Sequence, residues 1–163
     1  MFTIKEILTV AVKVEKNGED YYREALEKTA RTPMGRLFEF LADEEKRHRL
    51  WFLEQSEKLV CSADGGQLGE MDEALIESLL QTKAFSLDDI DLVGLTVPQS
   101  LLETAIEFEN DTILFYEMIS EFINEKDTVE QLRDIIAEER GHCKLIQEFF
   151  EKSSKGKAAE NQR

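Results

Sequence analysis

Apolar residues recur at helical intervals along four stretches of the chain. In the first, Thr3 to Glu6 has the form of a capping box, and one broad apolar face then runs from about residue 4 to 29. Thr32 and Pro33 supply an N-cap and a first-turn proline for a second helix, which is predicted to end near residue 60. Because only a short turn separates these stretches, they are predicted to form an antiparallel helical hairpin.

The second half of the chain has the same arrangement. Capping-box residues at 100–103 open a third helix that is predicted to stop near Asn124, and a cap at Asp127 opens a fourth. These helices form a second hairpin over about 100–153. Residues 154–163 have no apolar face and are predicted to be a disordered tail.

The segment between the hairpins, residues 61–99, breaks the helical pattern except for a short amphipathic stretch at 72–80. A connection of this length lets the second hairpin join a bundle through a long crossover. The predicted fold is therefore all-α: a four-helix bundle of two antiparallel helical hairpins, about 4–60 and 100–153, whose crossover contains a short helix. One domain is predicted over residues 1–153.

The two hairpins also repeat each other in sequence. The segment that ends at residue 48 has a second copy 94 positions later, and each copy places a glutamate three residues before a histidine. That spacing puts both side chains on one face of a helix. A further glutamate lies thirty residues before each of these glutamates. The matched residues are Glu15, Glu45 and His48 in the first half and Glu109, Glu139 and His142 in the second.

All six residues fall on the predicted inner faces, and the glutamates of each hairpin lie at about the same height. Four carboxylates buried together without compensation would cost many kcal/mol through desolvation and mutual repulsion. Two divalent cations would neutralise them, and the glutamate–histidine spacing is that of metal ligands. The alternative is a core in which the glutamates are protonated or paired with lysine.

Composition and charge narrow the range of partners. The chain has 163 residues and a formal net charge of −15, which disfavours nucleic acid and anionic membranes and suits a protein that takes up cations. No stretch approaches the roughly 18 apolar residues of a membrane span, and no leader pattern is seen, so a cytoplasmic location is expected. Cys61 and Cys143 are too few for a four-thiolate site and are expected to be structural thiols.

Matching motifs occur in both halves of the chain. They are Val14-Glu15, Tyr21-Tyr22, Glu44-Glu45 with His48, Ala105 to Glu109, Phe115-Tyr116, and Glu138-Glu139 with His142. Over residues 5–150 the chain thereby resembles the rubrerythrin branch of the ferritin-like di-iron carboxylate superfamily. The resemblance implies two iron ions per chain, although manganese or zinc would suit the same ligands.

The resemblance also assigns roles to the six residues, as metal ligands and hence as catalytic residues. It implies that Glu45 and Glu139 bridge the two metals. Glu15 and His48 would complete one coordination sphere, and the second half would complete the other with Glu109 and His142.

Residues next to the predicted ligands carry further expectations. By the resemblance, Glu44 should accept a hydrogen bond from His142, and Glu138 should accept one from His48. Tyr22 and Tyr116 follow the first glutamate of each half by seven residues on the same stripe. Each hydroxyl is expected either to bond a ligand carboxylate or simply to pack in the core.

The sequence departs from the rubrerythrin pattern in two respects. Thr112 stands where rubrerythrins carry a further glutamate, which suggests a more symmetric, ferritin-like centre. No rubredoxin-like segment is found in the sequence either, since such a segment requires four cysteines.

The function implied by the resemblance is a non-haem di-iron oxidoreductase. It would reduce hydrogen peroxide or dioxygen with electrons from an external donor such as a rubredoxin-like protein. Two other functions stay open: ferritin-like iron oxidation for storage or delivery, and metal binding by a helical bundle without catalysis. Trp51 and the ten phenylalanines are expected in the core, or in part on the surface of a homodimer.

Overall fold

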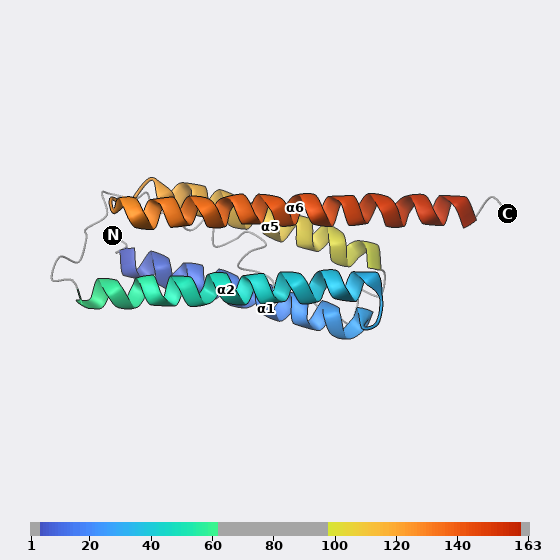
Figure 1. Cartoon of the computed structure of the whole chain (residues 1–163), viewed down its shortest axis with the longest axis horizontal. Helices are drawn as coiled ribbons and strands as arrows, with labels where there is room; N and C mark the ends of the chain where they lie inside the picture. Colours follow the sequence, from blue (N-terminus) through green and yellow to red (C-terminus); the bar gives the residue numbers. More distant parts are fainter. Residues whose placement is uncertain (1–3, 62–97, 161–163) are drawn as a thin grey trace.

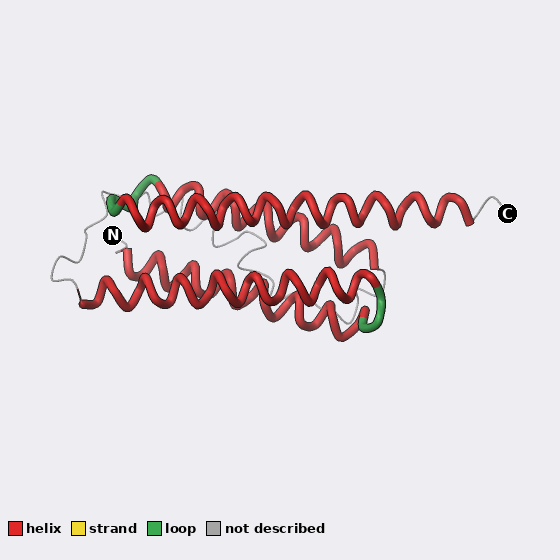
Figure 2. The backbone as a smooth tube through the Cα atoms, viewed as in Figure 1, coloured by secondary structure: helices red, strands yellow, loops and turns green. Residues whose placement is uncertain are grey.

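The computed structural model describes residues 4–61 and 98–160, and within these ranges the chain forms four helices and no strand (Figure 1). The tube drawing shows two long hairpins lying side by side (Figure 2). In each hairpin the two helices pack closely against each other. The predicted all-α four-helix bundle is confirmed. The helices are α1 (Ile4–Thr29), α2 (Pro33–Cys61), α5 (Pro98–Ser120) and α6 (Lys126–Glu160).

The turn between α1 and α2 follows from local chemistry, and both helices have the predicted bounds to within a residue. Arg31 has a φ of 65°, the left-handed conformation with which many helices end. Thr32 is the N-cap of α2, because its Oγ1 accepts a hydrogen bond from the Gly35 amide at 3.1 Å. A Cβ on Gly35 would lie 2.5 Å from the Thr29 carbonyl oxygen, so this close approach requires glycine.

The third helix differs from its predicted bounds at both ends. It begins at Pro98, two residues earlier than the capping box indicates, since proline is favoured in the first turn of a helix. It ends at Ser120 rather than near Asn124, because the chain tightens there. The Phe122 amide bonds the Ile119 carbonyl at 3.0 Å, an i to i−3 bond that closes the helix.

The fourth helix corrects the prediction of a disordered tail. α6 continues to Glu160, and in Figure 1 its C-terminal part extends beyond the rest of the bundle. A segment without an apolar face is expected to be disordered by itself, but elongating an existing helix needs only backbone hydrogen bonds and good helix formers such as Ala, Lys and Glu. Residues 161–163 and the predicted crossover helix at 72–80 lie outside the described residues.

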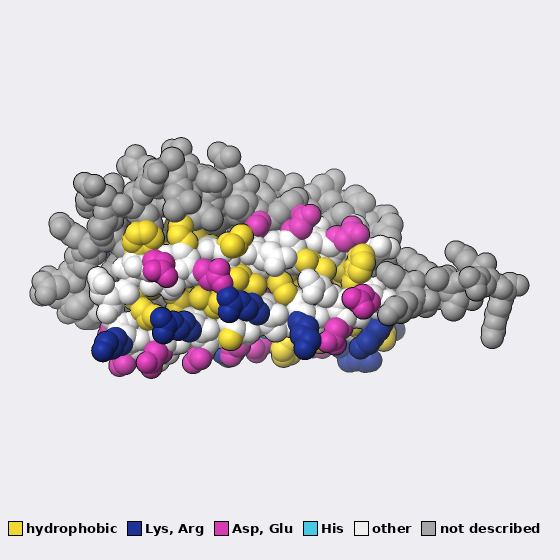
Figure 3. Space-filling view, turned by 90° about the horizontal axis from the view of Figure 1, so that it is seen from above, with side chains coloured by type: hydrophobic (Ala, Val, Ile, Leu, Met, Phe, Trp, Pro, Cys, Tyr) yellow, Lys and Arg dark blue, Asp and Glu magenta, His cyan; other side chains and the backbone are white. Residues whose placement is uncertain are grey.

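The core runs along the bundle axis between the hairpins. Its largest fully buried side chains include Tyr22, Phe38, Phe52, Phe108 and Tyr116. None of the described helices is both long and apolar enough to cross a membrane. On the face drawn in Figure 3, hydrophobic side chains are interspersed with acidic and basic ones, and no histidine is visible among the described residues.

Candidate metal centre

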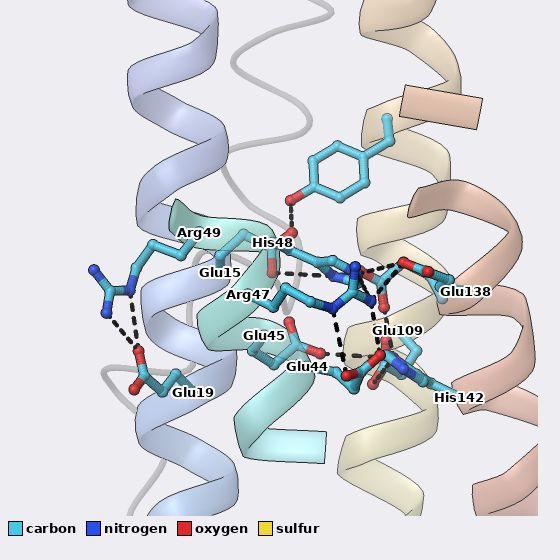
Figure 4. Close-up of polar contacts among 12 residues, drawn as sticks. Glu15, Glu19, Glu44, Glu45, Arg47, His48, Arg49, Glu109, Glu138 and His142 are labelled. Carbon is cyan, nitrogen blue, oxygen red and sulfur yellow. Dashed lines mark hydrogen bonds and ion pairs between the residues drawn. The ribbon is translucent and has the colours of Figure 1, made fainter. Parts of the chain in front are cut away.

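The four helices bring the six predicted residues together in the middle of the core. α1 supplies Glu15, α5 supplies Glu109, and α2 and α6 each supply a glutamate and a histidine (Figure 4). Five of the six side chains are 0% exposed and His142 is 4% exposed. The helical spacing predicted this convergence. Their role as metal ligands stays a prediction.

The six residues form two clusters that share two members. One contains Glu15, Glu45, His48 and Glu139, and the other contains Glu45, Glu109, Glu139 and His142. In each cluster one ligand atom from every residue lies within 4.8 Å of the others. Glu45 and Glu139 therefore occupy the positions at which a carboxylate can reach both clusters.

Glu139 lies between the two histidines. Its Oε1 is 2.7 Å from His48 Nδ1, and its Oε2 is 2.8 Å from His142 Nδ1. The two imidazole rings are nearly parallel, with centroids 6.0 Å apart and an interplanar angle of 24°. Both histidines thus turn Nδ1 toward the shared carboxylates.

Several buried atoms of the site have no hydrogen-bond partner. They are Glu15 Oε2, both carboxylate oxygens of Glu45, His48 Nδ1, Glu109 Oε2 and Glu139 Oε1. His48 Nδ1 and Glu139 Oε1 are 2.7 Å apart but do not meet hydrogen-bond geometry. An unsatisfied buried polar group costs about 1–3 kcal/mol, which makes this arrangement unfavourable without a bound ion.

This donor set fits divalent metal ions. Carboxylate oxygens and imidazole nitrogens suit iron, manganese and zinc, and four glutamates with two Glu-x-x-His pairs are the ligand set of di-iron and di-manganese bundles. Protonated glutamates, the alternative from the sequence, would describe the site without metal, where a proton on one carboxyl group can bond a neighbouring carboxylate such as that of Glu15 or Glu45. Lysine pairing is not seen for these residues in the described part of the chain.

Two tyrosines hold glutamates across the hairpins. The Tyr22 hydroxyl in α1 donates to Glu109 Oε1 in α5, and the Tyr116 hydroxyl in α5 donates to Glu15 Oε1 in α1. Both phenols are fully buried. The first of the two expectations for these tyrosines is therefore confirmed: they bond the site carboxylates and also pack in the core.

Burial dominates the electrostatics of the carboxylates. It raises the pKa of Glu15 from its usual 4.5 to about 7, although the charge of His48 opposes the shift. Burial also raises the pKa of Glu45 and of Glu109 well above the usual range, and the charge of Glu139 adds to both effects. Without metal, these three carboxyl groups therefore retain protons that a bound cation would displace.

Glu139 and His48 form the charged pair of the metal-free site. Burial acts to lower the pKa of His48, but Glu139 and Glu15 outweigh it and raise that pKa to about 10. Burial acts in the opposite direction on Glu139, where the charges of His48 and His142 prevail and hold its pKa well below the usual range.

The outer nitrogen of His48 is held as predicted. His48 Nε2 lies 2.8 Å from Glu138 Oε2 in hydrogen-bonding geometry. The matching prediction for Glu44 and His142 is wrong, because Glu44 accepts its hydrogen bond from Arg47 at 2.7 Å. The role of Arg47 was not predicted from the sequence. The two motifs are otherwise similar but differ at this position, since Arg47 is matched by Gly141, and that difference could have pointed to it.

The two halves of the repeat also differ at the position one helical turn after Glu15 in the first half and after Glu109 in the second. Gly18 in α1 corresponds to Thr112 in α5. A Cβ on Gly18 would approach Phe108 within 2.7 Å and Glu45 Oε2 within 2.9 Å, so glycine is required beside the site. Thr112 is fully buried, and its hydroxyl has no hydrogen-bond partner.

Comparison with known proteins agrees with this geometry. The family model described as Rubrerythrin matches residues 6–75, a range that contains Glu15, Glu45 and His48. In fold, the chain is similar to the crystal structure of a candidate ferritin-like diiron-carboxylate protein from Thermotoga maritima, with a TM-score of 0.69 and 25% sequence identity. That match covers 93% of this chain and 97% of the other.

The resemblance to the rubrerythrins is confirmed. A hypothetical protein from Pyrococcus furiosus shares the fold, with a TM-score of 0.67, 19% identity, and coverage of 92% of this chain and 89% of the other. No curated protein matches the sequence. The rubrerythrin match and the buried cluster together support a carboxylate–histidine site able to bind metal.

Proposed function

We propose that the protein is a non-haem di-iron oxidoreductase of rubrerythrin type that reduces hydrogen peroxide, or dioxygen, with electrons from an external donor. The observation that carries the proposal is the pair of shared carboxylates. Glu45 and Glu139 belong to both clusters, and both oxygens of Glu45 are buried without a partner. A mononuclear or purely structural site would not need two bridging positions.

The chain would hold the two ions with residues from all four helices. Glu15 and His48 would complete one coordination sphere, Glu109 and His142 the other, and Glu45 and Glu139 would bridge them. Two ferrous ions held by these residues would supply the two electrons that reduction of a peroxide bond requires.

The surrounding residues would orient these ligands. Tyr22 and Tyr116 each bond one oxygen of a glutamate that belongs to a single cluster, Glu109 and Glu15 respectively. The other oxygen of each glutamate can then face the centre. Glu138 accepts the Nε2 proton of His48, so the lone pair of Nδ1 faces inward. Buried aromatic side chains such as Phe108 and Phe52 keep bulk water away.

A surface pocket of about 310 Å³ adjoins the centre between α2 and α6. Its lining includes His48, Glu138, Trp51 and Asp134. Because His48 lies at both the pocket and the core, we propose that a small oxidant and protons would approach the ligands from this side.

The electrons would come from a separate carrier. The two cysteines cannot form a four-thiolate iron site, and Cys143 is a buried thiol whose pKa burial raises to about 12, so it is a poor redox group. A rubredoxin-like protein would match the resemblance.

Rapid mixing of the ferrous-loaded protein with oxidants tests the proposal. Hydrogen peroxide should oxidise the protein in a single turnover faster than dioxygen does. Steady-state peroxide consumption should stay near background until a rubredoxin and its reductase are added. Sustained turnover with NADH alone would contradict the proposal. Faster oxidation by dioxygen would contradict peroxide as the preferred oxidant.

One observation favours ferritin-like iron oxidation as a second candidate. Thr112 occupies the position at which rubrerythrins carry a further glutamate, and the threonine hydroxyl forms no hydrogen bond. Without that carboxylate the ligand set is the same in both halves, as in ferritin-like centres. Repeated uptake of ferrous iron, with ferric product accumulating beyond two ions per chain, would support this candidate over peroxide reduction.

A further inference from the structure

The internal repeat places different residues at one matched position beside the candidate metal centre. Arg47 precedes His48, whereas Gly141 precedes His142. The neighbouring Glu-Glu pairs and histidines match in the two motifs. The difference is also one of space, since a Cβ added to Gly141 would meet no atom within 4 Å.

The Arg47 side chain binds two carboxylates from different helices. Its Nη2 donates to Glu44 Oε2 at 2.7 Å and to Glu138 Oε2 at 2.8 Å (Figure 4). The same oxygen of Glu138 lies 2.8 Å from His48 Nε2. Arg47 therefore fixes the carboxylate that in turn fixes the His48 ring with Nδ1 facing the core.

His142 lacks the corresponding support. Its hydrogen bond is made by the inward nitrogen, Nδ1, to Glu139 Oε2 at 2.8 Å. Its ring is met edge-to-face by Phe40, with centroids 5.9 Å apart, and Phe40 is itself 46% exposed. Within the described ranges no carboxylate is recorded at His142 Nε2. Glu44, the residue matched to Glu138, is held by Arg47 instead.

We propose that Arg47 makes the two halves of the centre unequal, by securing Glu138 on His48 and by keeping Glu44 away from His142. A first divalent ion then binds in the half with Glu15 and His48, and the second ion binds more weakly in the half with Glu109 and His142. This inference rests on the proposed metal binding. Arg47 acts as a positioning residue, because it contacts Glu138 and the outer nitrogen of His48 (Nη2 to Nε2, 3.3 Å) rather than the metal.

Nuclear magnetic resonance of the two histidine rings tests the inference directly. The chain contains two histidines, so ring ¹⁵N labelling of the zinc-loaded protein gives two spin systems. The Nε2 proton of His48 should exchange slowly with solvent, and that of His142 should exchange fast. In Arg47→Ala, the His142 proton should gain protection as Glu44 becomes free. Equal protection in the unmodified protein, or no change in Arg47→Ala, would overturn the inference.

Calorimetric titration with zinc ions gives a second readout that does not depend on turnover. Loss of a hydrogen bond to a ligating histidine typically costs about 10–100-fold in metal affinity, so the two binding steps should differ by about that factor. Arg47→Ala should bring the two affinities together. Arg47→Lys should give an intermediate ratio, because an ammonium group does not form the bidentate geometry of arginine.

Arg49→Ala is the matched control. Arg49 lies on the same helix and pairs with Glu19 at 2.9 Å, and its removal changes the net charge equally. The ratio of the two zinc affinities should be unchanged in this variant. An unchanged ratio in Arg47→Ala would overturn the inference alone, whereas failure of the unmodified protein to bind any zinc would overturn the proposed function with it.

Discussion

The two halves of the candidate centre have the same six-residue design but different surroundings. In the first half, His48 is buried completely and its outer nitrogen meets Glu138, which Arg47 also holds. In the second half, the ring of His142 is supported by the edge of an aromatic residue. The two halves therefore share their predicted ligands more closely than the residues that orient these ligands. The orienting residues make the metal affinity of the two halves differ.

The largest effect should come from removing a residue that both halves share. Glu45→Ala should abolish high-affinity binding of both zinc ions, since Glu45 belongs to both clusters. Glu15→Ala should remove mainly one binding step, because Glu15 belongs to one cluster. Metal analysis after loading and desalting measures the difference. Two zinc ions bound to Glu45→Ala would contradict a bridging role.

A pH series on the metal-free protein should show what the buried carboxyl groups cost. The folded state holds the proton of Glu15 up to about pH 7, whereas the unfolded chain releases it near the usual pKa of 4.5. The stability that this protonation provides is present below pH 4.5 and is lost as the pH rises to about 7. The shift corresponds to on the order of 3 kcal/mol for this buried group.

Bound metal should reverse that trend. The raised pKa values of Glu45 and Glu109 act in the same direction as that of Glu15 in the metal-free protein. Metal binding requires the ionised carboxylates, so the stabilisation by zinc should increase from pH 5 to pH 7.5. Thermal unfolding with and without zinc at both pH values is the measurement. A metal-free melting temperature that rises over this range would contradict the account.

Much of this arrangement was predictable from the sequence because it depends on helical periodicity. Spacings of three and thirty residues fix which side chains share a face and a height, and those spacings placed Glu15, Glu45 and Glu109 correctly. The contact of Glu44 was not predictable in the same way. Its pairing with Arg47 has the i, i+3 spacing of one helix, but whether Glu44 reaches His142 instead depends on the distance between α2 and α6, which periodicity does not give. The end of α6 was misplaced because helix propagation does not require an apolar face.

Removing the hydroxyl of Tyr22 or of Tyr116 should reduce the stability of the protein by about the same amount, because each hydroxyl bonds a site glutamate of the other hairpin. Tyr22→Phe leaves Glu109 Oε1 without its donor, and Tyr116→Phe does the same to Glu15 Oε1. Each change should cost about 1–3 kcal/mol in the metal-loaded protein, the usual effect of leaving a buried acceptor unsatisfied. Chemical denaturation of both variants provides the values. A large effect in one variant and none in the other would place the asymmetry in the tyrosines rather than at Arg47.

Two glycine substitutions should change the stability in opposite directions, and the second should give the smallest effect of all. Gly18→Ala should destabilise by about 1–3 kcal/mol, because the added methyl group meets Phe108 and Glu45 in a packed core. Gly141→Ala should stabilise by about 0.5–1 kcal/mol, since the new Cβ meets open space and alanine favours a helix. Melting temperatures of the two variants at one pH compare them. Loss of stability in Gly141→Ala would show that this position is not open.

The most direct test is an anaerobic titration of the unmodified protein with ferrous iron at neutral pH, with iron per chain and proton release measured together. The account predicts two ions per chain and the release of protons, because Glu15, Glu45 and Glu109 retain protons until metal displaces them. A protein with an intact helical circular dichroism spectrum that binds one ion, or none, would contradict a dinuclear centre.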